Sequence, residues 1–449
     1  VLPFRAGCLV YTMEQRNCNA LETIFAQANV TVGACVGFKT PLRVEDVKRA
    51  IRECLDINVC GCLEVVGVGT PVCKLRILRS SERNIRMVPY PVTADVAVVF
   101  QKLLATPDSF FPNRIDTVMI VEPDHGDRCH GVCFSGNHCL WDGKSIVQVV
   151  EGFLSLLSPK SKVGDITPPS KICYEWGQLL KDHAGAPCAS PVFLPIRFEH
   201  SGGILTMKDI QLSFHEETSE QYGVCDVRMD FEPLLLKGIL KLLRREQSGT
   251  LTSLLTVCLQ QALGEVYLSS TSKRGSDGTR TSCNMTTRIL VNLRQSLGTV
   301  TDKDRCVSQC FGHVVVGNTI QLLDGVGDSK TLLGLSKSTA LDLKDRISRG
   351  EAIAASLVLS EGNFDDGQKD HATFELSNFG VYDVGEDIVV YHTQRFEGYD
   401  GVSVLAHSEK STGVFRMACS LMGPINPELV AAVLQRTKDL FTLLVSTTE

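Results

Sequence analysis

The sequence lacks what marks several large classes of protein. No apolar stretch reaches the roughly 18 residues that a membrane-spanning helix needs. Lysine and arginine number 45 against 51 aspartates and glutamates, so the net charge of -6 provides no basic excess for nucleic acid or an anionic membrane. We therefore expect no nucleic-acid partner and no integral membrane segment.

Signals for export are also missing. The first residues lack the basic-then-apolar order of a secretory signal peptide, and the 18 cysteines are scattered through a long chain instead of forming a compact framework. Glycosylation-type triplets at Asn29 and Asn284 are weak contrary signals, because such triplets often arise by chance. The cysteine usage predicts free thiols in a reducing compartment and a cytoplasmic protein.

The length of the chain predicts two units instead of one small domain. Prolines and glycines accumulate among polar residues between positions 158 and 203, a composition typical of a linker. We therefore predict an N-terminal lobe over 1–180, a crossover linker over 181–205 and a C-terminal lobe over 206–449.

Both halves contain a strand, a tight turn and an apolar helix. In the first half, His130–Asn137 is a predicted strand, and apolar residues recur at helical spacing from Ile146 to Leu157. In the second half, a predicted strand over Val414–Leu421 precedes a helix with Asn426 as its cap and Pro427 in its first turn. The repetition predicts an internally duplicated α/β fold, with one helix near Ala340–Ile347 among the later strands.

The most informative segment is His138-Cys139-Leu140-Trp141-Asp142-Gly143, an HxxxDG motif where the predicted strand gives way to a turn. A histidine there is held by backbone on both sides, and its unperturbed pKa near 6.5 suits proton abstraction at neutral pH. The motif predicts a general base at His138. The alternative is a structural histidine near the core, which is the commoner role of a lone histidine.

Histidines and cysteines around this motif also raise the question of a zinc site. They are His125, Cys129, His130, Cys133, His138 and Cys139. If the segment is a strand, Cys129 and Cys133 lie on one face and His130 and His138 on the other, so four ligands could not converge. We therefore expect no metal.

With its features in this order, the sequence resembles the superfamily of CoA-dependent acyltransferases built like chloramphenicol acetyltransferase. The resemblance rests on the HxxxDG motif, the proline- and glycine-rich crossover, Val291-Asn292-Leu293-Arg294 with Phe311-Gly312 following, and Leu376-Ser377-Asn378-Phe379-Gly380. It implies an α/β fold of two similar lobes, each a mixed sheet with flanking helices, and a channel between them. A segment near 373–400 would cross back to the first lobe.

The resemblance also implies roles for the residues of the motif. His138 would take the proton from an acceptor as it attacks a thioester carbonyl. Asp142 would point away from the channel and hold the turn in shape, with Arg294 as its candidate partner across the lobes. Gly143 would let the backbone turn sharply beside the ligand.

Further residues are candidates for contact with the reacting groups. Ser377 and Asn378 would offer hydrogen bonds to the oxyanion, or they form only a turn. Trp141 would line the channel or pack beneath the turn. A basic helix over 237–245 would meet the phosphates of CoA, although such a face is usually only solvated, and no glycine-rich phosphate loop supports it.

Departures from the family patterns indicate which branch of the superfamily the sequence resembles most. Relatives such as the peptide condensation domains carry a second histidine before the catalytic one, whereas this chain has Asn137, as many alcohol acyltransferases do. The Asp-Phe-Gly-Trp-Gly signature of plant-type members is missing, and His313 stands where relatives often have asparagine. The sequence therefore looks closest to the alcohol acetyltransferase and polyketide-associated branches.

We therefore expect an O-acyltransferase that moves an acyl group, such as acetyl, from acyl-CoA to a hydroxyl of a small apolar acceptor in one direct step. No cofactor would be bound permanently, acyl-CoA would be a co-substrate, and the protein would be a monomer. The alternatives are N-acyl transfer or condensation from a carrier-protein thioester, and a non-catalytic scaffold that binds an acyl ligand or a protein. A serine hydrolase is disfavoured because no Gly-x-Ser-x-Gly elbow occurs.

Overall fold

The computed structural model describes most of the chain. The described residues are 15–68, 70, 72–77, 85–89, 96, 98–99, 113–123, 126–157, 177, 180–181, 195–196, 198, 204–206, 209–210, 225–272, 282–297, 309–321, 329–362, 372–395, 401–422 and 426–447. The predicted linker over 181–205 lies largely outside the described residues.

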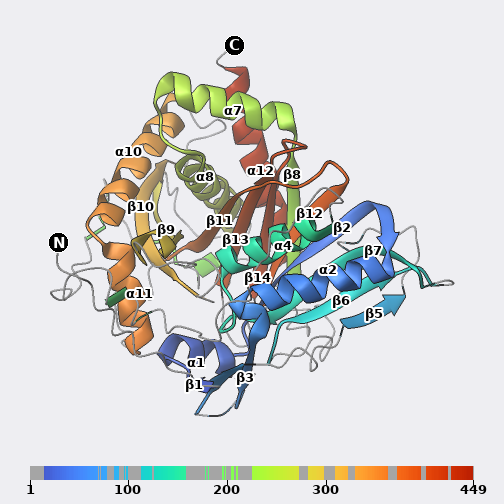
Figure 1. Ribbon diagram of the computed structural model, residues 1–449. Helices are drawn as coiled ribbons and strands as arrows, with labels where there is room; N and C mark the ends of the chain where they lie inside the picture. The colour runs from blue at the N-terminus through green and yellow to red at the C-terminus, as the bar shows by residue number, and fades with distance from the viewer. Residues whose placement is uncertain are drawn as a thin grey trace, which may run out of the picture.

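The first sheet has five strands in the order β12-β2-β7-β6-β5, with β5 parallel to β6 and the other pairs antiparallel. Helices α2 and α4 lie side by side over this sheet (Figure 1). The elements are β2 (Thr31–Arg43), α2 (Val44–Ile57), β5 (Ile85–Pro89), β6 (Asp116–Val121), β7 (Arg128–Asn137), α4 (Gly143–Leu157) and β12 (Ile388–Arg395).

The central strand β7 is covered on both faces. Val132 and Phe134 pack into the core beneath α2 and α4, whereas Cys133 packs with Val118 and Ile120 on the opposite face. This burial explains why the sequence of β7 shows no polar alternation. The apolar face of α4 anchors the same core and leaves the β7–α4 turn at the end of the sheet.

The second sheet has six strands in the order β10-β9-β11-β13-β14-β8 and is also mixed, because β11 is parallel to β9 and β13. Helices α8 and α12 pack together over it, and α10 packs on α8 (Figure 1). The elements are β8 (Cys225–Phe231), α7 (Pro233–Glu246), α8 (Leu251–Ser272), β9 (Ser282–Asn292), β10 (Phe311–Gln321), α10 (Ser329–Ser348), β11 (Phe374–Tyr382), β13 (Gly401–Glu409), β14 (Phe415–Met422) and α12 (Pro427–Ser446).

Smaller elements complete the described part of the chain. They are β1 (Gln15–Asn17), α1 (Ala20–Gln27), the 3-10 turn η1 (Val59–Cys62), β3 (Leu63–Val66), β4 (Lys74–Ile77), the 3-10 turn η3 (Arg294–Leu297) and α11 (Glu351–Glu361). Strands β1, β4 and β3 form a small third sheet. Helix α1 packs against α11, so an early segment of the chain contacts the second half.

Strand β12 joins the two halves. The chain leaves the second sheet after β11, adds β12 to the edge of the first sheet beside β2, and returns to the second sheet at β13. Of the segment near 373–400, β11 therefore stays in the second sheet and β12 lies in the first. Because of this crossover, residues of both sheets surround a single cavity.

Several elements were not predicted from the sequence. Strand β2 contains Gly33 and Gly37, which weaken the strand pattern, yet Gly33 lies so close to the backbone that an added Cβ would stand 2.3 Å from the Phe134 carbonyl oxygen. The helix predicted near Ala340–Ile347 is present as part of α10, but the sequence did not predict a second helix, α11, directly after it. Helix α11 is apolar on several sides and carries no amphipathic period to reveal it.

Two compositional expectations can be compared with the described residues. Within that part of the chain, no helix is both long and apolar enough to cross a membrane. Among the cysteines whose burial the structure describes, all except Cys18, Cys62 and Cys283 are buried. The buried thiols pack as small apolar side chains.

Gly312 allows β10 to pass close to α11. A Cβ at this position would stand 1.9 Å from the backbone oxygen of Ala352. We expect Gly312→Ala to lower the free energy of unfolding by about 1–3 kcal/mol, because backbone must shift to admit the methyl group. A urea titration measures the change.

Gly334 provides the matched control, since it lies in α10 and a Cβ there would meet nothing within 4 Å. Gly334→Ala should raise the free energy of unfolding by about 0.5–1 kcal/mol through helix propensity. Equal effects of the two substitutions would contradict the close approach at Gly312.

Candidate functional site

A cavity of about 390 Å³ lies where the two lobes meet. The first lobe contributes the β7–α4 turn, the second contributes the ends of β9 and β11, and β12 contributes part of the wall. The lining includes His138, Asp142, Leu290, Phe311, Ser377, Phe379 and His392. The wall mixes aliphatic and aromatic side chains with polar and charged ones, which make up half of its lining residues.

His138 follows directly after β7. Its backbone N–H donates to the carbonyl of Val30 at 2.6 Å, and its own carbonyl accepts a hydrogen bond from the side chain of Gln309. The histidine is therefore held from the first lobe through Val30 and from the second through Gln309. It is only 8% exposed, and it lines the cavity.

The environment of the imidazole ring favours its neutral form. Burial lowers the pKa of His138 below its ordinary value of 6.5, and the carbonyls of His138 itself and Trp141, together with the charge of Asp142, oppose this shift only in part. Nδ1 is buried, and no described residue forms a well-aligned hydrogen bond with it. At neutral pH the ring is therefore uncharged and able to accept a proton.

Asp142 and Arg294 form a bidentate ion pair across the lobes. The two guanidinium nitrogens lie 2.8 and 3.0 Å from the two carboxylate oxygens. Both residues are almost fully buried, at 2% and 1% exposure. The structure thus brings together the two residues that the sequence analysis paired.

Neighbouring groups add further hydrogen bonds to this pair. The backbone N–H groups of Ser145 and Cys310 donate to the carboxylate, each at 2.8 Å, and Arg294 donates to the Ser145 hydroxyl at 2.8 Å. Burial would raise the pKa of Asp142, but Arg294 and these N–H groups outweigh it and lower the pKa below 3.8. Asp142 is therefore a permanent carboxylate, unsuited to exchange protons at neutral pH.

Asp142 also serves as the N-cap of α4. Its carboxylate accepts the N–H of Ser145, and its carbonyl accepts the first helical N–H, from Ile146, at 2.9 Å. A negative charge at this end of a helix is favourable. One side chain thus fixes the start of α4 and the contact between the lobes.

Gly143 is needed for a different reason from the one predicted. Its φ angle is not in the left-handed region, so no sharp turn demands glycine there. A Cβ would instead stand 2.3 Å from the ring of Phe379, which comes from β11 in the other lobe. Glycine at this position therefore lets the two lobes approach closely.

Ser377 and Asn378 both line the cavity, but their side chains differ in how they are engaged. Asn378 donates to the hydroxyl of Thr252 at 3.0 Å and accepts the N–H of Gly380 at 3.0 Å. Its amide thus braces the bend in β11. Ser377, by contrast, makes no side-chain hydrogen bond with another described residue, and it is 7% exposed at the cavity.

Trp141 does not contact the cavity. It is fully buried in the core of the first lobe, and its indole N–H donates to the Gly136 carbonyl at 3.4 Å. Of the two roles that the sequence left open for Trp141, lining the channel or packing beneath the turn, this position matches the second.

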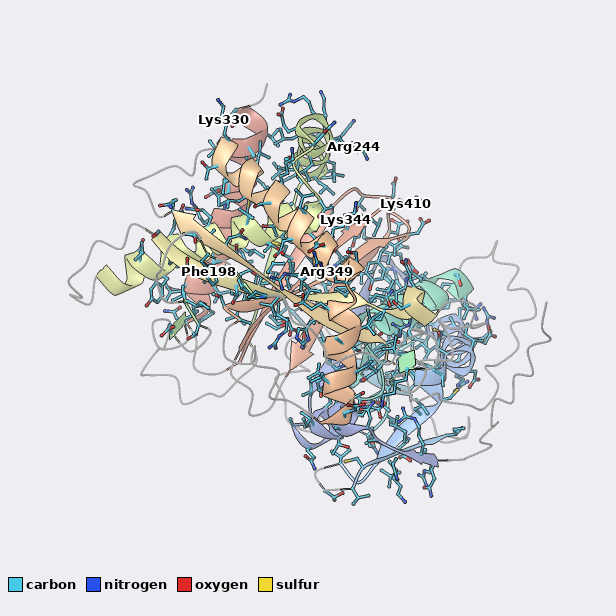
Figure 2. All side chains as sticks on the ribbon, turned by 90° about the vertical axis from the view of Figure 1, so that its left-hand side faces the viewer. Phe198, Arg244, Lys330, Lys344, Arg349 and Lys410 are labelled. Atoms are coloured by element: carbon cyan, nitrogen blue, oxygen red, sulfur yellow. The ribbon has the colours of Figure 1, made fainter. Side chains whose placement is uncertain are left out.

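Other candidate ligands lie apart from the cavity. The basic residues of α7 do not line it, and Figure 2 shows Arg244 at the end of the molecule that carries α7. Among the described residues, no group of three or more histidine, cysteine, aspartate or glutamate side chains could hold a metal ion. The phosphates of a CoA-like ligand would need other partners, and Lys144 is a cation in the cavity wall.

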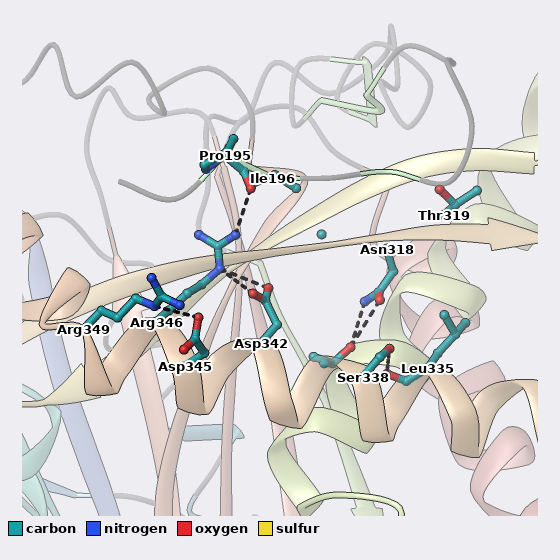
Figure 3. A pocket seen from close by; sticks show the side chains of 12 residues that line it. Pro195, Ile196, Asn318, Thr319, Leu335, Ser338, Asp342, Asp345, Arg346 and Arg349 are labelled. Carbon is teal, nitrogen blue, oxygen red and sulfur yellow. Dashed lines mark hydrogen bonds and ion pairs between the residues drawn. The ribbon is translucent and has the colours of Figure 1, made fainter. Parts of the chain in front are cut away.

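A second cavity, of about 540 Å³, lies between β10 and α10 (Figure 3). Its charged groups satisfy one another: Arg346 binds Asp342 and Glu351, and Arg349 binds Asp345. Asn318 is hydrogen-bonded within the wall. Its lining residues include no histidine or cysteine, and Asp342 and Asp345 are paired with arginines, so the cavity at His138 is the better candidate site.

Sequence comparison finds no family model that matches this chain. No curated protein matches it either. Solved structures do match. Polyketide synthase associated protein 5 from Mycobacterium tuberculosis has a TM-score of 0.62 at 11% identity, over 95% of this chain and 97% of that one.

Two further structures show how widely this fold is used. The TRI3 trichothecene 15-O-acetyltransferase from Fusarium sporotrichioides has a TM-score of 0.63 at 12% identity, over 96% of this chain and 95% of that one. The epimerization domain from the third module of tyrocidine synthetase B has a TM-score of 0.59 at 10% identity, over 96% and 98%.

These similarities establish the class of fold. The protein has the two-lobed, chloramphenicol-acetyltransferase-like fold that acyltransferases and condensation-type domains share, with two mixed sheets flanked by helices. The predicted fold class is confirmed. At such low identity the likeness extends to the fold alone, and the chemistry has to be argued from the site.

Sequence reasoning missed two residues of the site: Phe25 packs on His138, and Gln309 binds its carbonyl. Phe311, which packs on His138, and Phe379, which packs on Gly143, stood in the segments that carry the family resemblance but were given no role. No local pattern connects Phe25 or Gln309 with the motif, because each comes from a distant segment. Ser145 is the exception, since an aspartate three residues before it is a helix-cap signal.

The buried ion pair predicts a large stability effect when one partner is removed. Arg294→Met leaves the Asp142 carboxylate buried without its cation, and we expect it to cost about 3–5 kcal/mol of unfolding free energy. The double variant with Asp142→Asn should lose less, because no charge is left unpaired. Because the pKa of Asp142 is lowered, the pair contributes fully above pH 3.8, and this contribution is lost as the pH falls through the folded-state pKa.

Arg349→Met is the control, because the Arg349–Asp345 pair is exposed, at 61% and 48% of the two side chains. It should change the unfolding free energy by less than about 1 kcal/mol. Urea titrations at several pH values measure all three variants. A similar, small loss for Arg294→Met would show that the interlobe pair does not hold the turn.

The contact between Gly143 and Phe379 predicts a second effect at the same turn. Gly143→Ala should lower the unfolding free energy by about 1–3 kcal/mol, since the Phe379 ring is stacked on His392 at 4.1 Å between ring centroids and has little room to move. Adding Phe379→Leu should restore part of the loss by removing the ring.

Gly152→Ala is the matched control in the same helix, because a Cβ there would meet only ordinary contacts, the nearest at 3.6 Å. It should be neutral or stabilising in the same titration. If Phe379→Leu failed to relieve Gly143→Ala, the steric account of Gly143 would be wrong.

Proposed function

We propose that this protein is an O-acyltransferase that moves an acyl group, such as acetyl, from acyl-CoA to a hydroxyl of a small, largely apolar acceptor. The observation that carries the proposal is the neutral, buried imidazole of His138 in an interlobe cavity. The fold supports it, because one protein with the same fold is by its name an O-acetyltransferase.

His138 is the general base of the proposed reaction. In the proposed reaction the tautomer with its proton on Nδ1 is the active one, because it leaves Nε2 to accept the proton of the acceptor hydroxyl. The freed oxygen attacks the thioester carbonyl carbon and forms a new C–O bond. The C–S bond then breaks, and the thiolate of CoA takes the proton from His138. No covalent acyl-enzyme is needed.

Ser377 is our candidate donor to the oxyanion of the intermediate. Its hydroxyl lines the cavity with no competing partner among the described residues, whereas Asn378 is engaged by Thr252 and Gly380. A donor already in place in a dry cavity lowers the barrier by a few kcal/mol. Asn378 would act by holding the bend of β11, so that Ser377 faces the cavity.

Asp142 and Arg294 take no part in proton transfer in this proposal. The lowered pKa of Asp142 and its saturation with donors suit a group that fixes the turn carrying His138. We propose a small apolar acceptor because Leu290, Phe311 and Phe379 form an apolar part of the cavity wall.

A carrier-protein thioester is the second candidate donor, since condensation and epimerization domains have the same fold. Asn137 bears on this alternative. It occupies the place of the second histidine of condensation domains, and here its side chain accepts the N–H of Cys139 at 3.0 Å and donates to the Phe25 carbonyl at 3.1 Å. Asn137 therefore has a structural role, because it links the turn after β7 to α1. This role favours acyl-CoA over a carrier-protein thioester as the donor.

Thiol release from a panel of acyl-CoAs, with and without alcohols, tests the proposal. We expect alcohol-dependent release that His138→Ala lowers by about 10²- to 10⁴-fold, the usual contribution of a general base. Because the pKa of His138 lies below 6.5, the rate should be level at neutral pH and should fall only below pH 6.5, as the ring becomes protonated.

His130→Ala is the matched control, because His130 lies on β7 but outside the cavity and contacts Glu122 at 3.4 Å. It should leave the rate unchanged. Amines and a pantetheine-loaded carrier protein are included as further substrates. Equal rates for wild type and His138→Ala would contradict the proposed mechanism. Transfer from the carrier protein but not from acyl-CoA would show that the donor is a carrier-protein thioester.

A further inference from the structure

The ring of Phe25, on α1, stacks on the imidazole of His138. The two ring centroids are 4.3 Å apart and the planes differ by 14°. Phe311, at the start of β10, lies 5.6 Å from the same imidazole and 6.5 Å from Phe25. Phe25 is not part of the cavity wall, so its ring covers the face of His138 that the cavity leaves free.

Helix α1 is anchored firmly enough to hold this ring in place. Asn19 and Glu22 form a capping box at its start, and Arg16 binds the Glu22 carboxylate with two nitrogens at 2.6 and 2.7 Å. The end of the helix is tied to the motif itself, because Asn137 donates to the carbonyl of Phe25.

The second lobe supports the other side of α1. Phe25 packs with a buried apolar cluster that includes Leu21, Val314 and Ala352, and α1 contacts α11. The position of the Phe25 ring therefore depends on both lobes and on the residue directly before His138.

Few charges face the imidazole. Asp142 is the charged group that acts on its pKa, and that carboxylate is bound to Arg294. Among the described neighbours, α1 and β10 present the phenyl rings of Phe25 and Phe311, and Gln309 is neutral. Apart from the Asp142 carboxylate, the main influence on the pKa of His138 is therefore its burial under the rings of Phe25 and Phe311.

We propose that Phe25 is a positioning residue for His138, which fixes the plane of the imidazole and excludes water from one of its faces. This inference deepens the proposed function and rests on His138 as its base. A ring stacked at 4.3 Å prevents rotation of the imidazole and leaves no space for a water molecule. The imidazole at the cavity wall is then held in one orientation.

Two substitutions separate water exclusion from the aromatic face. Phe25→Ala removes both the volume and the π face, whereas Phe25→Leu keeps most of the volume and removes only the face. The π face of the Phe25 ring by itself would attract a protonated His138 and raise the pKa of this histidine. Burial acts in the opposite direction and dominates in the intact protein.

An NMR titration of histidine-labelled protein measures the pKa of His138 directly, with His138→Ala used to assign its signal. We expect Phe25→Ala to raise the pKa of His138 towards 6.5, because water reaches the ring. Phe25→Leu should leave it near the wild-type value. The signal of His130, on the same strand, is the internal control for an intact fold in each spectrum. A fall of the pKa in both variants, or no change in Phe25→Ala, would overturn the inference.

The rate of acyl transfer gives the second readout. Phe25→Ala should lower kcat by about 10- to 100-fold with little change in KM, because the base loses its orientation and the substrates keep their contacts. Phe25→Leu should recover most of the rate. The two proposals fail separately: a shifted pKa in a protein without transferase activity would refute only the proposed function, and an active enzyme with unchanged pKa and kcat in Phe25→Ala would refute only this inference.

Discussion

The ion pair between Asp142 and Arg294 is the constraint on which the site depends. It links the turn after β7 to the end of β9, and it saturates its oxygen atoms with the N–H groups of Ser145 and Cys310. Burying two charges is costly unless they are paired and fully hydrogen-bonded. The lobes can therefore approach in only one way, with the carboxylate of one lobe against the guanidinium of the other, and this approach creates the cavity.

Two residues of the same turn, His138 and Asp142, have different roles. Asp142 keeps its charge and carries the structure, whereas His138 loses charge through burial and is left with a free basic nitrogen. Contacts from distant segments enforce this division: Gln309 holds the backbone of His138, and Phe25 holds its ring. Gly143 completes the arrangement, because any side chain there would displace Phe379 and separate the lobes.

Much of this organisation could be predicted from local patterns. Helix α4 shows its buried face in the sequence, α12 shows its cap at Asn426, and the HxxxDG motif marks the site. Strand β2 and helix α11 could not be predicted, since burial on several sides removes the polar alternation that reveals an element. The role of Trp141 was open for a related reason: a tryptophan beside a site can face either the ligand or the core.

The sequence by itself predicted an α/β fold with a repeated unit and His138 as a candidate base, because these depend on local spacing and on residue chemistry. The resemblance to a known family added the two lobes and the pairing of Asp142 with Arg294. Only the tertiary structure decided why Gly143 is glycine, which of Ser377 and Asn378 keeps a free donor, and what covers His138. The physical reason is that these properties are set by contacts between segments more than a hundred residues apart. Local sequence constrains such contacts only through the folded chain.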